Sequence, residues 1–187
     1  SDLFAQAKTL GSLVQVEHTK LETLRNFQAL LLEKLQGSDP AAKQAAVTLM
    51  PIVQQAIVLA GKYDNVIANP PYMGNKYLIP VVKDYLKTHF KGYDKDLFSA
   101  FIIRNLQFAK DRGQLGFMTP FVWMFISSYE ELRMHLINEK TITSLIQLEY
   151  SGFDGATVPI CTFTLENAHN PGFKGGYVRL SDFKGAA

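Results

Sequence analysis

A short apolar run that ends in two consecutive prolines, YDNVIANPPYMGN, is the feature that most restricts how this chain can fold. The residues NVIA predict a short, buried β-strand. A proline disfavours helical backbone for the residue before it, so Asn69 and Pro70 are both expected to be extended. The rings of Pro70 and Pro71 also fix φ and remove two backbone N–H donors. The strand must therefore stop at Asn69, on a stiff shelf whose free polar groups are acceptors.

This shelf suits the binding of a planar group that carries an NH₂. The side-chain oxygen of Asn69 and the carbonyl of Pro70 can both accept hydrogen bonds from one donor, and Tyr72 adds a flat aromatic face. An exocyclic amine of a base and an amide both fit. The simpler alternative is a strand that ends in a Pro-Pro turn with a packed tyrosine. Since proline makes up only about 5% of residues, the pattern directly after an apolar strand favours the binding interpretation.

The first sixty residues have helical patterns. Apolar residues recur at three- and four-residue steps from Glu17 to Gln36. A second helix is expected to begin with Asp39 as N-cap, to end at Gly61, and to be kinked or split at Pro51. We therefore expect a helical segment over residues 1–61 and a second part over residues 62–187.

The second part alternates strand and helix patterns. A helix is expected to begin near Asp94 or Asp96 and to end at Gly113, and another to begin with a capping box of Ser127 and Glu130. The segments QLGFM, TITSLIQLE, TVPICTFTLE and GYVRL are further candidate strands. This alternation predicts a three-layer α/β fold with a largely parallel sheet and an antiparallel edge.

Three loops are expected at the carboxyl ends of the strands, where open α/β sheets bind their ligands. They cover residues 69–75, 119–125 and 150–157. The first carries Asn69 and Tyr72, the second carries Thr119 in a strand-ending turn, and the third carries Phe153. We expect these loops to line one crevice.

Lysines come after the shelf at short intervals. Lys83, Lys87 and Lys91 are four residues apart, and Lys76 precedes them, so one face of a helix is expected to be basic. Beside a base pocket, such a face suits contacts with DNA phosphates. A solvated helix face explains the same lysines, and the net charge of +2 with a pI of about 8.6 does not decide between the two.

Other residue types exclude several kinds of site. The one cysteine, Cys161, rules out an internal disulfide, fits a reducing cytoplasm, and is expected to be packed in a strand. The four histidines lack metal-ligand spacing, so no metal is implied. We see no signal peptide and no apolar run of the roughly 20 residues that span a bilayer, so no membrane partner is expected. The start without methionine suggests a piece of a longer protein.

Several segments resemble one enzyme family. YDNVIANPPY is similar to motif IV of the amino methyltransferases. DLFSAFIIRNLQFAKDRGQLGFMTP and FDGATVPICTFTLE resemble the segments after that motif in the N6-adenine DNA methyltransferases of restriction and phage-defence systems. The nearest likeness is to the adenine-specific methyltransferases of BREX-type phage defence, in which ANPPYMG and an AKTLGSL-like segment occur together. The resemblance is strongest from Tyr63 to Glu166.

The resemblance implies roles for the shelf residues. Asn69 and Pro70, held by Pro71, would accept hydrogen bonds from the N6 amine of an adenine flipped out of double-stranded DNA. Tyr72 would stack on one face of the base and Phe153 on the other. The methyl donor would be S-adenosylmethionine, transferring its methyl group directly.

Family members hold that donor with a glycine-rich turn after their first strand, and we find no such turn before Tyr63. The chain therefore resembles the target-base half of a Rossmann-like methyltransferase domain, inactive in isolation. The NVIA strand would be left as an open sheet edge, to be covered by the first helices or by a second copy of the chain. Other subunits of a defence system are further possible partners.

Three alternatives stay open at this point. A protein glutamine methyltransferase uses a similar Asn-Pro-Pro-Tyr on an amide, but its pattern does not continue with DLFSAFIIRNL and GFMTP. An RNA-base methyltransferase would use the same shelf. The chain could also bind DNA or a partner without turnover.

Overall fold

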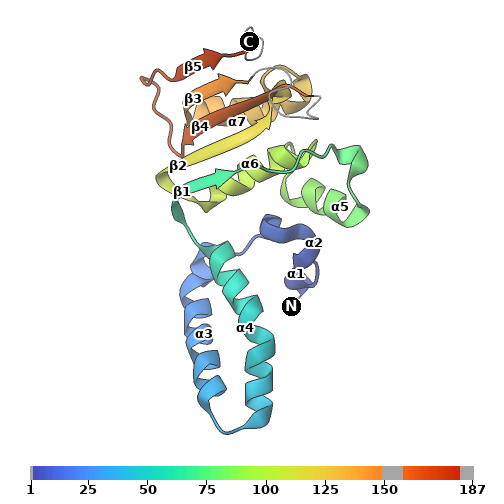
Figure 1. Ribbon diagram of the computed structural model, residues 1–187, viewed down its shortest axis with the longest axis vertical. Helices are drawn as coiled ribbons and strands as arrows, with labels where there is room; N and C mark the ends of the chain where they lie inside the picture. Colours follow the sequence, from blue (N-terminus) through green and yellow to red (C-terminus); the bar gives the residue numbers. More distant parts are fainter. Residues whose placement is uncertain (1, 149–157, 182–187) are drawn as a thin grey trace, which may run out of the picture. The chain divides into compact units, whose positions relative to one another are not determined.

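The computed structural model describes residues 2–148 and 158–181. The chain forms two compact units, Ser1–Lys62 and Tyr63–Ala187. The first is helical and the second is built on a β-sheet, as Figure 1 shows.

Four α-helices make up most of the first unit. They are α1 Asp2–Ala5, α2 Ala7–Leu10, α3 Leu21–Gln36 and α4 Pro40–Ala60, with 3₁₀ turns at Gly11–Leu13 and His18–Lys20. The capping residues are those that the sequence predicts. α3 ends at Gly37, and the carboxylate of Asp39 accepts a hydrogen bond of 2.9 Å from the N–H of Ala41 at the start of α4.

The proline inside α4 does not split the helix. α4 is continuous from Pro40 to Ala60 and includes Pro51. Pro51 cannot donate to the carbonyl of Val47, but Val47 is exposed, so water can reach that acceptor. The missing hydrogen bond is thus tolerated on the solvent side of the helix.

In the part of the chain that the structure describes, α4 is the one helix long and apolar enough to cross a bilayer, judged by length and composition alone. The expectation that no apolar run reaches that length is therefore wrong. The core helix of a soluble protein passes the same test. α4 also packs on α3 in a small core of Leu31, Ala46, Met50 and Val53.

The second unit contains all five strands expected from the sequence. They are β1 Tyr63–Ala68, β2 Ala109–Pro120, β3 Thr141–Gln147, β4 Ile160–Glu166 and β5 Gly176–Arg179. Its α-helices are α5 Pro80–His89, α6 Leu97–Phe108 and α7 Glu130–Glu139, with 3₁₀ turns η3 Asn75–Tyr77, η4 Phe121–Met124 and η5 Ser127–Tyr129.

The strands form one mixed sheet in the order β1-β2-β4-β3-β5. β1 is parallel to β2 and β3 is parallel to β5, whereas β4 is antiparallel to both β2 and β3. The α/β class is as expected, but the expected position of the antiparallel strand is wrong, because β4 lies inside the sheet. The connection through α7 leads from β2 to β3, which lies two positions away in the sheet. β4 then runs in the opposite direction between β2 and β3.

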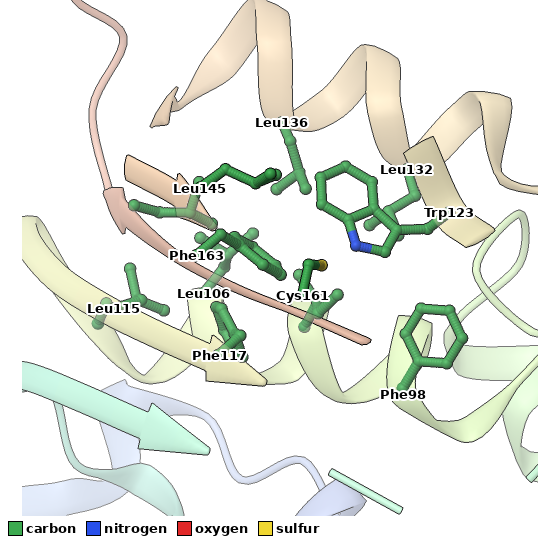
Figure 2. Packing of buried hydrophobic residues seen from close by; sticks show 13 residues of the cluster. Phe98, Leu106, Leu115, Phe117, Trp123, Leu132, Leu136, Leu145, Cys161 and Phe163 are labelled. Carbon is green, nitrogen blue, oxygen red and sulfur yellow. The ribbon is translucent and has the colours of Figure 1, made fainter. Parts of the chain in front are cut away.

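Both α6 and α7 pack on the same face of the sheet. The core there combines Phe98, Ile102 and Leu106 of α6, Leu132 and Leu136 of α7, and Leu115, Phe117, Leu145, Phe163 and Leu165 of the strands (Figure 2). Side chains of the opposite face are less covered, since Ile67 is 85% exposed and Thr164 is also exposed. The described part of this unit has two layers, not the three we expected. A sheet with antiparallel strands can face water on one side.

α6 ends earlier than its sequence pattern indicates. It stops at Phe108 instead of continuing toward Gly113, and the chain enters β2 directly. Asn167, which comes directly after β4, explains this end. Its side-chain Nδ2 donates hydrogen bonds of 3.2 and 3.0 Å to the carbonyls of Ala109 and Lys110. Nδ2 also lies 3.4 Å from the carbonyl of Leu106 in the last turn of α6, so a residue distant in sequence satisfies an acceptor that the end of the helix leaves free.

The capping box expected for α7 does not form. Ser127 lies in the 3₁₀ turn η5, the helix begins at Glu130, and no side chain caps it. Instead, the guanidinium of Arg133 donates hydrogen bonds of 2.7 Å to the carbonyls of Trp123 and Ile126. These bonds hold the turns between β2 and α7.

Candidate active site

The Asn-Pro-Pro-Tyr shelf follows a strand, as the sequence predicts, but the expectation that this strand is buried is wrong, because every residue of β1 is exposed or half-buried. Asn69 comes directly after Ala68, the last residue of β1. Pro70 is buried, whereas Asn69, Pro71 and Tyr72 are exposed. The structure thus presents the polar and aromatic side chains of the shelf to solvent and keeps one proline ring packed.

The oxygen of Asn69 already has one partner within the shelf. The hydroxyl of Tyr72 donates a hydrogen bond of 3.1 Å to Asn69 Oδ1. A carboxamide oxygen has two lone pairs, so it can accept a second hydrogen bond. The tyrosine therefore fixes the direction of the asparagine oxygen and leaves it able to accept from a ligand.

The residues after Tyr72 are hydrogen-bonded to a segment that follows α5 in the sequence. The N–H of Asn75 donates to the carbonyl of Lys95 at 2.9 Å, and the Asn75 side chain donates to the carbonyl of Asp94 at 2.9 Å. The N–H of Leu97 donates to the carbonyl of Met73 at 3.1 Å. The shelf is therefore attached to the start of α6 by backbone as well as by side-chain contacts.

Asp96 joins the shelf and α6 through one oxygen. Its Oδ1 accepts hydrogen bonds from the N–H of Met73 at 2.9 Å and from the N–H of Phe98 at 3.2 Å. The second bond is the N-cap of α6. The sequence predicts Asp96 only as a possible start of this helix. The sequence did not predict the hydrogen bond to Met73, because a polar residue before a helix indicates a helix cap and not a second, distant partner.

Burial shifts the pKa of several groups near the shelf. Burial raises the pKa of the Tyr72 hydroxyl, and Cys161 adds a smaller effect in the same direction. Burial also raises the pKa of the Cys161 thiol, against the opposing effect of hydrogen bonds from Thr119 and Trp123. Both groups are therefore neutral at physiological pH. Tyr72 remains a hydrogen-bond donor, and Cys161 is a packed thiol.

Asp96 is partly buried, and its charge affects Tyr129. Burial raises the pKa of Asp96, although hydrogen bonds from the N–H groups of Phe98, Met73 and Leu97 lower it. Burial, followed by the charge of Asp96, raises the pKa of Tyr129 to about 12. The Asp96 carboxylate thus sits in a partly desolvated place, where hydrogen bonds to a charged acceptor are strong.

The other expected loops leave the same edge of the sheet. Thr119 and Pro120 of β2 pair with Cys161 and Ile160 of β4, so the carboxyl end of β2 meets the start of β4. Thr119 is fully buried and accepts a hydrogen bond of 3.1 Å from the Trp123 indole. Thr119 and Pro120 are still part of β2, and the turn begins only at Phe121, so the expected turn lies one residue later than Pro120. Phe153 and the whole third loop, residues 150–157, lie outside the described residues.

A hollow of about 330 Å³ opens at this edge beside η4. Its lining residues are Phe121, Val122, Phe125, Gln147, Pro159 and Arg179. The expected loop 119–125 thus contributes to a hollow, but no residue of the loop 69–75 lines it. Phe125 is 70% exposed, and its position in a loop after a strand is the one local signal that could have drawn attention to it.

The four lysines predicted to contact phosphates lie close in sequence but on different elements. Lys76 is in η3, with its Nζ 4.7 Å from the centre of the Tyr77 ring. Lys83 and Lys87 are on α5, and Lys91 comes after the end of that helix. Lys83 is half-buried and the other three are exposed.

Two of these lysines share a hollow with acidic residues. The hollow has a volume of about 570 Å³ and is lined by Lys87, Lys91, Gly92, Asp94, Lys95, Ser127, Ser128, Glu130 and Glu131. Lysines and carboxylates are equally frequent in that lining. The surface at Lys87 and Lys91 is therefore mixed in charge, and a role for the lysines in phosphate binding stays a prediction.

The described residues contain no group of three or more His, Cys, Asp and Glu side chains that could hold a metal ion. Before β1, the described residues contain no glycine that follows a strand. β1 is the first strand that the structure describes, and the glycines before it, Gly11, Gly37 and Gly61, lie at helix ends. The residues described here thus do not fit the glycine-rich turn that the family resemblance implies for S-adenosylmethionine.

The fold is that of a class I methyltransferase. A Listeria monocytogenes protein described as a class I S-adenosylmethionine-dependent methyltransferase matches 96% of this chain and 70% of its own, with a TM-score of 0.52 and 15% identity. The methyltransferase subunit of a type I restriction-modification system from Streptococcus thermophilus matches 67% of this chain and 28% of its own, with a TM-score of 0.51 and 20% identity.

Within that class, the chain belongs to the Eco57I restriction-modification methylase family, whose model matches residues 5–153. The adenine-specific methyltransferase BrxX of Escherichia coli O9:H4 (strain HS) is 37% identical over 96% of this chain. The adenine-specific methyltransferase PglX of Lacticaseibacillus casei (strain Zhang) is 27% identical over 96%. The chain spans 15% of the length of each of these two relatives. The family expected from the sequence is confirmed.

Proposed function

We propose that this chain forms the target-amine site of a DNA methyltransferase that methylates N6 of adenine, in a restriction-modification or phage-defence system in the cytoplasm. We further propose that it works within a longer polypeptide. Two observations support this proposal: the relatives are adenine-specific methyltransferases, and the chain spans only 15% of their length.

The fixed oxygen of Asn69 carries the proposal. It lies at the end of β1, next to a proline that is buried, and the Tyr72 hydroxyl sets its direction at 3.1 Å. The second lone pair of this oxygen and the carbonyl of Pro70 are the two acceptors for the adenine amine. Acceptors on both N–H bonds orient the amine toward a methyl donor, so positioning and electrostatics provide the catalysis.

The target adenine must leave the double helix to reach this site, at a cost of a few kcal/mol. Tyr72 is placed to stack on the extruded base, and Phe153 is our second stacking residue. Stacking contributes about 1 to 3 kcal/mol per base and offsets the cost. No covalent intermediate with the protein is needed, and the buried Cys161 takes no part in the reaction.

Another section of the longer polypeptide is proposed to bind S-adenosylmethionine, because the described residues before β1 contain no strand and no glycine-rich turn that follows one. Calorimetric titration of the 187-residue chain with S-adenosylmethionine tests this point. No heat up to millimolar cofactor is the expected result. Saturable binding at micromolar concentrations would contradict the proposed division of the site.

An Asn69→Ala variant of the longer polypeptide tests the function itself. We expect methylation of adenine in duplex DNA to fall on the order of 10²-fold or more, because one preorganised hydrogen bond is lost. DNA binding should change little. Asn65→Ala, at an exposed position of β1, is the matched control. Equal loss of methylation and binding in Asn69→Ala would mean that the shelf is only structural.

The basic residues of α5 and its flanks, Lys76, Lys83, Lys87 and Lys91, are proposed to contact DNA phosphates. A Lys83→Glu, Lys87→Glu double variant should weaken DNA binding at low salt and reduce the salt dependence of binding. The double variant Lys140→Glu, Lys174→Glu makes the same change of charge elsewhere. Equal affinities of the two double variants would rule out a specific role for these lysines.

The open edge of β1 is proposed as a site of association. β1 pairs with β2 on one side and is the terminal strand of the described sheet. A free edge can pair with another strand, from a second copy of the chain or from another subunit of the system. Light scattering of the chain should show a dimer if two copies pair there, and a monomer would contradict homodimer formation.

A further inference from the structure

The hydrogen bonds around the shelf concentrate on one short segment, residues 94–97. Along the chain, η3 and α5 separate this segment from the shelf. Gly74 and Asp96 form an isolated antiparallel bridge, which brings the two backbones together. The shelf is thus supported by a segment that contributes none of the acceptors proposed for the amine.

Asp96 is the residue of this segment whose side chain reaches the shelf. Its Oδ1 is shared between Met73 N–H at 2.9 Å, 23 residues earlier in the chain, and Phe98 N–H at 3.2 Å. Met73 comes directly after Tyr72, so the bond limits the movement of the tyrosine that orients Asn69. A single side-chain oxygen therefore links the helix α6 to the position of the proposed amine acceptor.

Local dipoles partly offset the burial that raises the pKa of Asp96. Asp96 is half-buried, and its carboxylate lies at the N-terminus of α6, where the helix dipole stabilises negative charge. Hydrogen bonds to an ionised acceptor are shorter and stronger than neutral ones. The hydroxyl of Ser99 donates a hydrogen bond of 2.9 Å to the Asp96 carbonyl, which further fixes the residue.

We propose that Asp96 is a positioning residue, which holds the Asn-Pro-Pro-Tyr shelf in its active geometry through Met73. This inference rests on the proposed function. Asp96 does not touch the amine in this scheme and acts only through the shelf. Displacement of a reacting group by about 1 Å can lower a rate on the order of 10²-fold, so loss of the tether should affect turnover strongly.

Asp39 provides a matched control for the capping part of this role. Like Asp96, it precedes an α-helix and accepts a hydrogen bond from a backbone N–H two residues later, at 2.9 Å. It lies in the helical unit, and its capping bond leads only to Ala41. Asp39→Ala thus removes a helix cap alone, whereas Asp96→Ala removes a helix cap and the tether to Met73.

Amide hydrogen exchange of the 187-residue chain tests the tether without any need for activity. Asp96→Ala should accelerate exchange of the Met73 amide by about tenfold or more, because its acceptor is lost. Asp39→Ala should leave this amide unchanged. Asp96→Asn keeps an acceptor oxygen and should preserve most of the protection, which also covers the case in which Asp96→Ala does not fold. Two results would contradict the tether. One is unchanged exchange of the Met73 amide in a folded Asp96→Ala variant. The other is full loss of protection of this amide in both Asp96 variants and in Asp39→Ala.

Kinetics of the longer polypeptide then test the positioning role. Asp96→Ala should lower kcat for adenine methylation on the order of 10²-fold with little change of KM for DNA, and Asp96→Asn should recover most of the rate. If the wild-type protein is active and Asp96→Ala methylates adenine as fast as Asp39→Ala does, the positioning role alone is contradicted. A wild-type protein that does not methylate adenine would instead overturn the proposed function, while the exchange result still reports on the tether.

Discussion

The two units of this chain bury their apolar side chains in different ways. In the helical unit, α3 and α4 meet along one seam with a core of Leu31, Ala46, Met50 and Val53. Other side chains of these helices remain open, such as Leu32 at 53% and Val58 at 58% exposure. In the sheet unit, 13 residues form a continuous layer between one sheet face and two helices (Figure 2). A two-helix seam gives each side chain fewer neighbours, so equal truncations should cost less there.

The largest effect is expected in the layer of the sheet unit. Phe163 is 1% exposed, and its ring centre lies 5.2 Å from that of Phe117 and 5.0 Å from that of Trp123. Phe163→Ala should lower the free energy of unfolding by about 3 to 5 kcal/mol. Urea unfolding measures this loss. Tyr177→Ala, at a 62% exposed position of β5, serves as the control and should have almost no effect.

A smaller loss is expected in the seam of the helical unit. Leu31 is 5% exposed, and Leu31→Ala should lower the free energy of unfolding by roughly 2 to 3 kcal/mol, near the lower end of the range for buried leucines. The neighbouring Leu32→Ala should be nearly neutral, because Leu32 is largely open to solvent. If Leu31→Ala cost as much as Phe163→Ala in the same urea experiment, the contrast between the two cores would be wrong.

Loss of a helix cap should cost less than either core truncation. Asp39→Ala removes the acceptor for the Ala41 N–H and should lower the free energy of unfolding by about 1 kcal/mol. Asp39→Asn keeps an acceptor of equal quality and should restore the stability. Thermal unfolding followed by circular dichroism in the far ultraviolet separates these outcomes, and an Asn variant as unstable as the Ala variant would exclude capping.

The smallest effect is expected at the start of the sheet. Hydrogen bonding from Lys110, followed by its positive charge, lowers the pKa of Asp64, and both Lys110–Asp64 distances are 2.9 Å. A lowered pKa contributes stability above the unfolded-state pKa, and this is lost as the pH falls through the folded-state value. Because the Asp64 carboxylate is exposed, Asp64→Asn should not measurably shift the urea midpoint at neutral pH. Below about pH 4, the midpoint of the variant should fall with pH as steeply as that of the wild-type protein. A clear shift would show that this exposed pair is stronger than its setting implies.

The shelf could be predicted from sequence because its constraints are local. Pro70 and Pro71 fix their own backbone and that of Asn69, so the end of β1 is determined within a few residues. The caps at Asp39 and Asp96 are local in the same sense. The segments that resemble the methyltransferase family also lie around these positions, which is why fold class and family could be read without the structure.

Long-range contacts account for most of what the sequence did not reveal. The antiparallel strand β4 takes an inner position because it pairs with both β2 and β3, and no residue pattern inside β4 indicates these two partners. The tether from Asp96 to Met73 joins positions 23 residues apart. The sequence alone also does not predict that Lys87, Lys91 and Lys95 share one hollow with Glu130 and Glu131.

The contact between Asn167 and the junction of α6 and β2 has a consequence for the order of folding. The amide of Asn167 binds the carbonyl of Lys110 from 57 positions further along the chain, and that of Leu106 from 61 positions. During synthesis, these carbonyls must therefore remain hydrated until β4 has left the ribosome and paired with β2. Contacts over such separations form late and slow the folding of a domain. The turn that leads from α6 into the centre of the sheet is thus among the last parts of this unit to reach its final form, although its own residues are made early.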